Sequence, residues 1–256
     1  MIRGIISALG LLALWDIFVR VTEVPPFLLP APARVAWVLW DRGDIILGHA
    51  VTTAAEILLG LALGALAGAG AALLLAAWRA GRRWLLPILL VSQAIPVFAI
   101  APLLVLWLGY GMASKVAMAV LIIFFPVATS FHDGLRRTEP GLVDLATTMG
   151  ASRASLLWRV RVPAALPSLS SGLRVAAGVA PIGAVVGEWV GSSAGLGYLM
   201  LQANGRSQAD MMFAALFVLA LMALALWFAT DRLLRRMIPW QPDTLLSDTD
   251  DRNSTP

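Results

Sequence analysis

The sequence predicts an all-α membrane protein with six transmembrane helices, and three observations support this fold class. Hydrophobic residues make up 59% of the chain and charged residues only 13%, whereas about 25% of the residues in an ordinary soluble domain are charged. Six apolar runs have about the length that crosses a bilayer. The basic residues gather between these runs, where they report orientation and do not indicate a nucleic-acid partner. The absence of cysteine excludes disulfides and thiolate metal sites.

The first predicted span covers residues 5–21, in which Asp16 and Arg20 can pair on one helix face. A signal peptide is the alternative, because Arg3 precedes an apolar stretch. No small-x-small cleavage site follows and Asp16 interrupts the run, which favours a retained helix. Four prolines then predict an extended outer segment that turns into a short helix over residues 33–47.

The second predicted span covers residues 50–78 and contains a stripe of glycines. Gly60, Gly64 and Gly68 recur every fourth residue, a spacing that lets another helix approach closely. The stripe predicts helix packing within the subunit, and a dimer contact is the alternative. Glu56 lies near the outer end of this span, where we expect its carboxylate to reach the membrane interface.

The third predicted span, residues 85–108, contains three prolines, each of which removes a backbone donor and kinks the helix. Broken helices are tolerated in membranes where they line a cavity. Gln93 and Pro96 are therefore candidates for a translocation path. A helix that is bent only for packing explains the same residues equally well.

The fourth and fifth spans are predicted over residues 115–130 and 168–189. Ser114 is a candidate N-cap for the fourth, and Arg174, near the inner end of the fifth, can snorkel to the interface. Glu188, followed by Trp189, is the notable residue of the fifth span, because an ionisable group at membrane depth suggests a functional site. The alternative for Glu188 is a capped helix end in contact with lipid headgroups.

The sixth predicted span covers residues 211–230, twenty residues without a charge. The polar tail after it is predicted to be disordered. These spans divide the chain into an N-terminal part (residues 1–48), a core of five spans (49–236) and a tail (237–256). The only two histidines, His49 and His132, fall on opposite sides in this topology, so no metal site and no catalytic cluster is expected.

A patterned loop, residues 139–163, separates the fourth and fifth spans. Glu139 and Pro140 predict the start of a helix, whose apolar face ends at Gly150, a residue suited to a left-handed helix end. A second helix is predicted over residues 152–162, stopped by Pro163 and Pro167. The sequence thus predicts two short helices joined at a glycine bend.

This loop resembles the "EAA" loop of ATP-binding cassette (ABC) importer permeases, patterned E-A-A-x3-G-x9-I-x-L-P. Asp144-Leu145-Ala146, Gly150 and Val160-Arg161-Val162-Pro163 match its spacing at every step. The resemblance implies a type I ABC importer permease fold and a loop that docks onto a separate ATPase subunit. It implies coupling roles for seven residues: Asp144, Ala146, Gly150, Ala151, Val160, Val162 and Pro163. A basic amphipathic loop lying on anionic membrane lipid is the alternative.

Basic residues are distributed unevenly across the predicted membrane. Twelve lie on the side of the termini and of residues 139–163, and five lie on the other side. The positive-inside rule therefore places both termini and this loop in the cytoplasm. For a bacterial cell, the expected location is the inner membrane.

The wider resemblance covers residues 25–240 and is to ABC permeases of the nitrate, sulfonate and taurine type. QAIPVFAIAPLLVLWLGYG (residues 93–111) and APIGAVVGEWVGSSAGLGYLM (residues 180–200) look most like permeases for pyrimidine precursors of thiamine. The resemblance implies import of a small polar solute by a permease homodimer. Two ATPase chains and a periplasmic or lipid-anchored solute-binding protein are the implied partners. No cofactor is expected in this chain, with ATP and Mg²⁺ held by the ATPase.

Two other functional classes fit the sequence less well. A carrier driven by an ion gradient would need several buried ionisable residues, and only Glu56 and Glu188 come close. An intramembrane enzyme would need a motif such as HExxH or Gly-x-Ser-x-Gly, and the sequence has neither. The sequence also has no phosphate-binding loop, so energy from ATP must come from another subunit.

Overall fold

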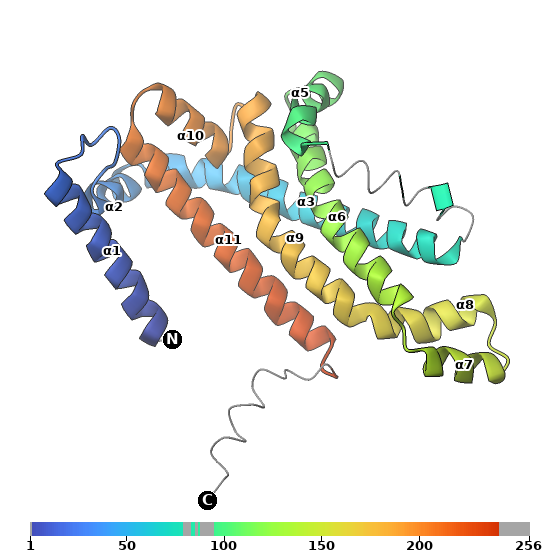
Figure 1. The fold of residues 1–256 in the computed structure, drawn as a ribbon. Helices are drawn as coiled ribbons and strands as arrows, with labels where there is room; N and C mark the ends of the chain where they lie inside the picture. Colours follow the sequence, from blue (N-terminus) through green and yellow to red (C-terminus); the bar gives the residue numbers. More distant parts are fainter. Residues whose placement is uncertain (1, 79–82, 85–86, 88–94, 241–256) are drawn as a thin grey trace, which may run out of the picture.

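The computed structural model describes residues 2–78, 83–84, 87 and 95–240 (Figure 1). All regular elements among these residues are helices, as the composition predicts. In chain order they are α1 (Ile2–Thr22), α2 (Pro32–Asp41), α3 (Gly43–Ala77), α5 (Val97–Leu108), α6 (Met112–Arg136), α7 (Pro140–Thr148), α8 (Arg153–Leu156), the π-helical turn η1 (Leu157–Arg161), α9 (Val162–Gly191), α10 (Leu196–Gly205) and α11 (Ala209–Met237).

The predicted all-α membrane fold is confirmed. Four helical stretches in the described part of the chain are long and apolar enough to cross a membrane: α3, α6, the continuous stretch Arg153–Gly191, and α11. The first predicted span corresponds to α1, which has 21 residues. The third predicted span is described only at its end, where α5 has 12 residues, and Gln93 lies outside the described residues.

Several predicted boundaries are wrong. The outer short helix ends at Asp41, and α3 begins at Gly43, well before the predicted start at residue 50. Ser114 is not an N-cap, because α6 already begins at Met112 and the Ser114 hydroxyl donates back to the Gly111 carbonyl at 3.0 Å. Helix α10 was not predicted, because its 10 residues are too few to span a membrane and they follow a glycine-rich turn.

Helix α6 packs between α3 and α9 through glycines on both neighbours. A Cβ atom on Gly64 of α3 would lie 2.7 Å from Ile123 Cγ2, and one on Gly68 would lie 2.8 Å from the Phe124 carbonyl oxygen. From the other side, a Cβ atom on Gly183 of α9 would lie 2.8 Å from Ala119 Cα. Gly60 also faces Ala119. The glycine stripe of α3 therefore packs against α6 within this chain.

The two ends of the molecule carry different elements. In Figure 1, α7 and α8 lie at the lower end, together with the end of α11 and the start of α1. Helices α2 and α10 lie at the upper end, with α5 and the beginning of α6. The loop that carries α7 and α8 and the turn before α10 are thus separated by the length of the spanning helices.

Candidate functional site

The loop between α6 and α9 forms a bent pair of helices with a defined hinge. Helix α7 starts at Pro140, where the missing proline donor is not needed. At its end Gly150 has φ +78°, the left-handed conformation expected from the sequence. Gly150 N–H donates to the Thr147 carbonyl at 2.9 Å and Ala151 N–H to the Ala146 carbonyl at 3.0 Å. These two bonds form a Schellman motif, which fixes the direction in which the chain leaves α7.

The second helix of the loop does not stop at the prolines, contrary to the sequence prediction. It begins at Ser152, whose hydroxyl accepts from Ser155 N–H at 3.2 Å, and it continues through η1 into α9. Pro163 lacks an N–H, and its ring would crowd the carbonyl four residues earlier in a regular α-helix. The wider π-turn over Leu157–Arg161 provides the room. The loop is therefore continuous with the fifth span.

An apolar surface with a groove lies on this bent pair. Leu145 is 59% exposed and Met149 is 79% exposed, although both are large and apolar. They line a groove of about 500 Å³ together with Leu142, Ala146, Arg159, Val160, Pro163, Ala164 and Trp240. Three of the predicted coupling residues, Ala146, Val160 and Pro163, thus meet in one groove. Exposed apolar surfaces of this kind contact another protein or a membrane.

The remaining predicted coupling residues lie around the groove without lining it. Asp144 is exposed on α7, and its carboxylate makes no hydrogen bond or ion pair with the described residues. Gly150 and Ala151 form the bend, and Val162 is the first residue of α9. Gly150 and Ala151 therefore set the loop conformation, while Asp144 is available to a partner.

At the other end of the molecule, Glu188 caps the start of α10. Its carboxylate accepts from Gly197 N–H at 2.5 Å and Tyr198 N–H at 3.3 Å, and Thr53 Oγ1 donates to it at 2.7 Å. Thr53 Oγ1 in turn accepts from Leu196 N–H at 2.8 Å. A negative charge at a helix N-terminus is stabilised by the helix dipole and by the unpaired N–H groups there.

His49 completes this cap, because its Nδ1 accepts from Gly195 N–H at 3.0 Å. The N–H groups of four successive residues, 195 to 198, are thus paired with side chains of α3 and α9. His49 and Thr53 carry no sequence signal for this role, since their partners are more than 140 residues away. Glu188 is 1% exposed and so does not contact headgroups.

Two further ionisable residues are buried near Glu188. Glu56 is 2% exposed and lies against Glu188, so the expectation that its carboxylate reaches the interface is wrong. Lys115, at the start of α6, is also buried, and its ammonium donates to the backbone carbonyls of Tyr110 and Gly111. Glu188 and Lys115 bind backbone groups beside helix ends, whereas Glu56 lies inside α3 against Glu188.

The structure does not bring the candidate path residues together. Trp189 lines a cavity of about 810 Å³ between α9, α10 and α11, with Pro181, Met200, Asn204 and Met212. Glu188, the next residue on α9, is turned toward α3 and α10. Pro96 is the exposed N-cap of α5 and is absent from the described lining of this cavity. Of the three candidates that the structure describes, Trp189 lines this cavity, and Glu188 and Pro96 do not.

Comparison with known proteins identifies the family to which this chain belongs. Residues 60–241 match the model of the family described as "binding-protein-dependent transport system inner membrane component". The chain belongs to this family. It is an ABC importer permease subunit and a multi-pass membrane protein, as the patterned loop predicted.

Relatives with high identity carry related descriptions. A "probable ABC transporter permease protein" of Haemophilus influenzae is 54% identical over 89% of this chain and 93% of its own. The formylaminopyrimidine transport permease ThiX of Halalkalibacterium halodurans is 38% identical over 91% of this chain and 93% of its own. The taurine transport permease TauC of Escherichia coli is 30% identical over 90% of this chain and 86% of its own.

The fold also matches a solved transporter. A chain from inward-facing structures of the MetNI methionine ABC transporter superposes with a TM-score of 0.66 at 21% sequence identity. The match covers 78% of this chain and 97% of that chain. It identifies the type I importer permease fold.

Proposed function

We propose that residues 139–163 are the docking site for an ATP-hydrolysing subunit, and that this permease imports a pyrimidine precursor of thiamine. The observation that supports docking is the groove on α7, η1 and α9, in which Ala146, Val160 and Pro163 meet beside the exposed Leu145 and Met149. Docking of a partner buries these exposed apolar side chains. Burying them against a partner gains about 25 cal/mol per Å² of apolar surface.

Each coupling residue has a separate part in this proposal. Ala146, Val160 and Pro163 contact the partner, while Gly150 and Ala151 keep the two helices at a fixed angle. Asp144 offers an acceptor to a basic group of the partner. Val162 begins α9, so a displacement of the loop is passed directly into a spanning helix. The stretch Arg153–Gly191 is helical without a break, so the loop and the spanning helix are joined directly.

The topology and partners follow from this assignment. The permease lies in the bacterial inner membrane with both termini in the cytoplasm, consistent with the surplus of arginines on that side. It functions as a homodimer with two ATPase chains, which hold ATP and Mg²⁺, and it needs no cofactor of its own. A periplasmic or lipid-anchored solute-binding protein delivers the solute at the end that carries α2 and α10.

One observation supports the proposed solute, the 38% identity over 91% of the chain to a relative named for formylaminopyrimidine. Trp189 and Asn204 suit a flat nitrogen heterocycle, since an indole can stack on a ring and an amide can bond ring nitrogens. We place Gln93, Pro96 and Trp189 along the path, with Glu188 holding its wall through α10. A sulfonate or taurine is the second candidate, favoured by the 30% identity to a taurine permease.

The experiment is a titration of the solute-binding protein that stimulates transport by this permease. Calorimetry with formylaminopyrimidine, hydroxymethylpyrimidine, taurine and an alkanesulfonate should show tight binding of a pyrimidine only. Uptake of that solute by the complex reconstituted in liposomes should require Mg-ATP on the cytoplasmic side of the membrane. Binding of taurine alone would transfer the assignment to the second candidate, and uptake driven by a proton or sodium gradient without ATP would indicate a secondary carrier.

A further inference from the structure

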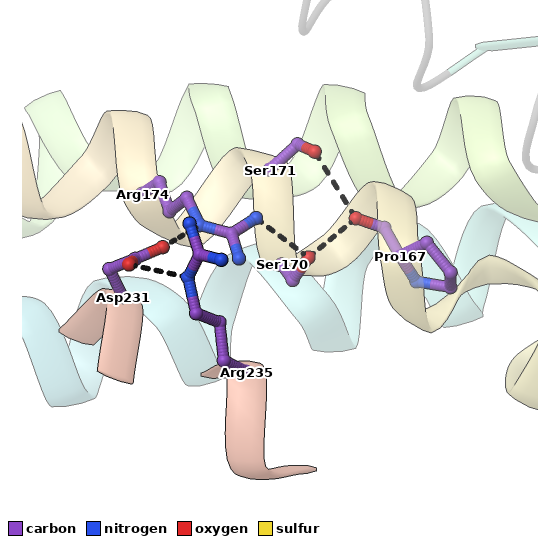
Figure 2. A network of polar contacts seen from close by, with 6 residues as sticks. All are labelled: Pro167, Ser170, Ser171, Arg174, Asp231 and Arg235. Atoms are coloured by element: carbon purple, nitrogen blue, oxygen red, sulfur yellow. Dashed lines mark hydrogen bonds and ion pairs between the residues drawn. The ribbon is translucent and has the colours of Figure 1, made fainter. Parts of the chain in front are cut away.

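A polar network joins the cytoplasmic parts of α9 and α11 (Figure 2). Arg174 Nε of α9 lies 2.7 Å from Asp231 Oδ1 of α11, and Arg235 Nε lies 2.8 Å from Asp231 Oδ2. Asp231 therefore accepts from a guanidinium on each helix. The Arg174 side chain, expected to reach the interface, is paired with a residue of the same chain. Charge-assisted bonds of this kind are stronger than neutral ones.

Arg174 is also held on its own helix. One of its terminal nitrogens donates to Ser170 Oγ at 3.2 Å, and Ser170 Oγ donates to the Pro167 carbonyl at 2.7 Å. Ser171 Oγ donates to the same carbonyl at 3.2 Å. Pro167 has no N–H to donate to the Pro163 carbonyl, whereas both serines donate to the Pro167 carbonyl, one turn further along α9 (Figure 2). Ser170 thus connects the Arg174 guanidinium to the backbone of α9.

The end of α11 meets the loop at a second place. Trp240, three residues after the end of α11, lines the groove with Met149, Pro163 and Ala164. The first half of α11 packs into a buried cluster with α2, α3, α9 and α10. Over its most apolar window, 11% of α11 is buried within the chain, against 44% for α6 and 50% for the stretch Arg153–Gly191. Interhelical polar contacts add to packing in holding membrane helices together, and the Arg174–Asp231 pair is such a contact between α9 and α11.

We infer that the Arg174–Asp231 ion pair makes α11 move together with the docking loop when the ATPase acts. This inference rests on the proposed docking of residues 139–163. Arg174 and Asp231 are positioning residues, because they act through the helices that they join and touch neither ATP nor solute. Arg235 binds the same carboxylate from within α11, four residues along the same helix.

The absence of native cysteine allows the inference to be tested with spin labels. Labels on Thr148→Cys and Leu233→Cys, both exposed, report the distance from the loop to α11 in the complete permease–ATPase complex in nanodiscs. Mixing labelled with unlabelled permease isolates the distance within one protomer, and we expect this distance to be narrow and the same without nucleotide and with trapped ATP. In Arg174→Gln, the distance should shift when ATP is trapped. Arg235→Gln is the matched control and should behave like the unsubstituted protein.

Arg174→Gln leaves Asp231 partly unpaired, so a second variant guards against misfolding. Arg174→Met with Asp231→Met replaces the pair by apolar side chains, a change that buried ion pairs often tolerate, and it should shift the distance as Arg174→Gln does. An unchanged distance in both variants, or an equal shift in Arg235→Gln, would overturn the inference.

A third label pair separates the inference from the proposed function. Labels at Thr148→Cys and Arg42→Cys should change their distance with ATP if the loop follows the ATPase. A constant distance between positions 148 and 42 would remove the docking proposal and the inference with it. If that distance changes but the distance between positions 148 and 233 is unaffected in Arg174→Gln, the inference alone is removed.

Discussion

Substituting Gly150 by valine tests whether the bend between α7 and α8 passes force from the ATPase. Gly150 has φ +78°, and no atom lies within 4 Å of where its Cβ would be. Valine at this position therefore meets backbone strain without a steric clash with neighbours. The left-handed conformation costs an L-residue about 1–2 kcal/mol. A cost of about 2 kcal/mol lowers the population of the bent loop, relative to other loop conformations, about 30-fold.

Gly141→Val is the matched control for this substitution. Gly141 lies inside α7 without a positive φ, and only Glu139 Oε1 comes as near as 4.0 Å to its Cβ position. Gly150→Asn is a second control, since asparagine tolerates the left-handed region at small cost. The solute imported per ATP hydrolysed should fall in Gly150→Val and stay near the unsubstituted value in both controls, measured with the complex in liposomes. Equal coupling in Gly150→Val and Gly141→Val would refute the role of the bend.

Two further predictions concern stability, measured as the thermal unfolding of the purified permease in detergent. Gly64→Leu should destabilise the folded permease by about 1–3 kcal/mol through overpacking against Ile123. Gly70→Leu should not, because no atom lies within 4 Å of the Cβ position at Gly70. Equal unfolding midpoints of the two variants would contradict the close packing of α3 on α6. Glu188→Ala should lower the midpoint more than Glu188→Gln, because each buried group left without an acceptor costs about 1–3 kcal/mol and glutamine keeps one oxygen. A midpoint equal in both variants would argue against the α10 cap.

Local signals predicted the loop well. Pro140 at the start of α7, Gly150 at its end and Ser152 before α8 act through their own backbone or a neighbour three residues away. The glycine stripe of α3 likewise follows from a spacing along one helix. Such features depend on residues close in the sequence, so they can be read without the fold.

Features that depend on distant partners could not be predicted. Pro163 was read as a helix stop, because the π-turn that accommodates it depends on how α9 packs. Glu188 pairs with Thr53, 135 residues earlier, and Arg174 pairs with Asp231, 57 residues later. Each of these residues taken singly fits a headgroup contact or a snorkelling side chain. Their roles follow only when α3, α9, α10 and α11 are placed together.

Photo-cross-linking tests the docking of residues 139–163 most directly. Met149 and Tyr110 are almost equally exposed, at 79% and 76%, but Met149 lies on the loop and Tyr110 at the opposite end of the molecule, at the turn before α6. A benzophenone amino acid at position 149 should form an adduct with the ATPase subunit in membranes, and one at position 110 should not. No adduct from position 149, or equal adducts from both positions, would contradict the docking of the ATPase on this loop.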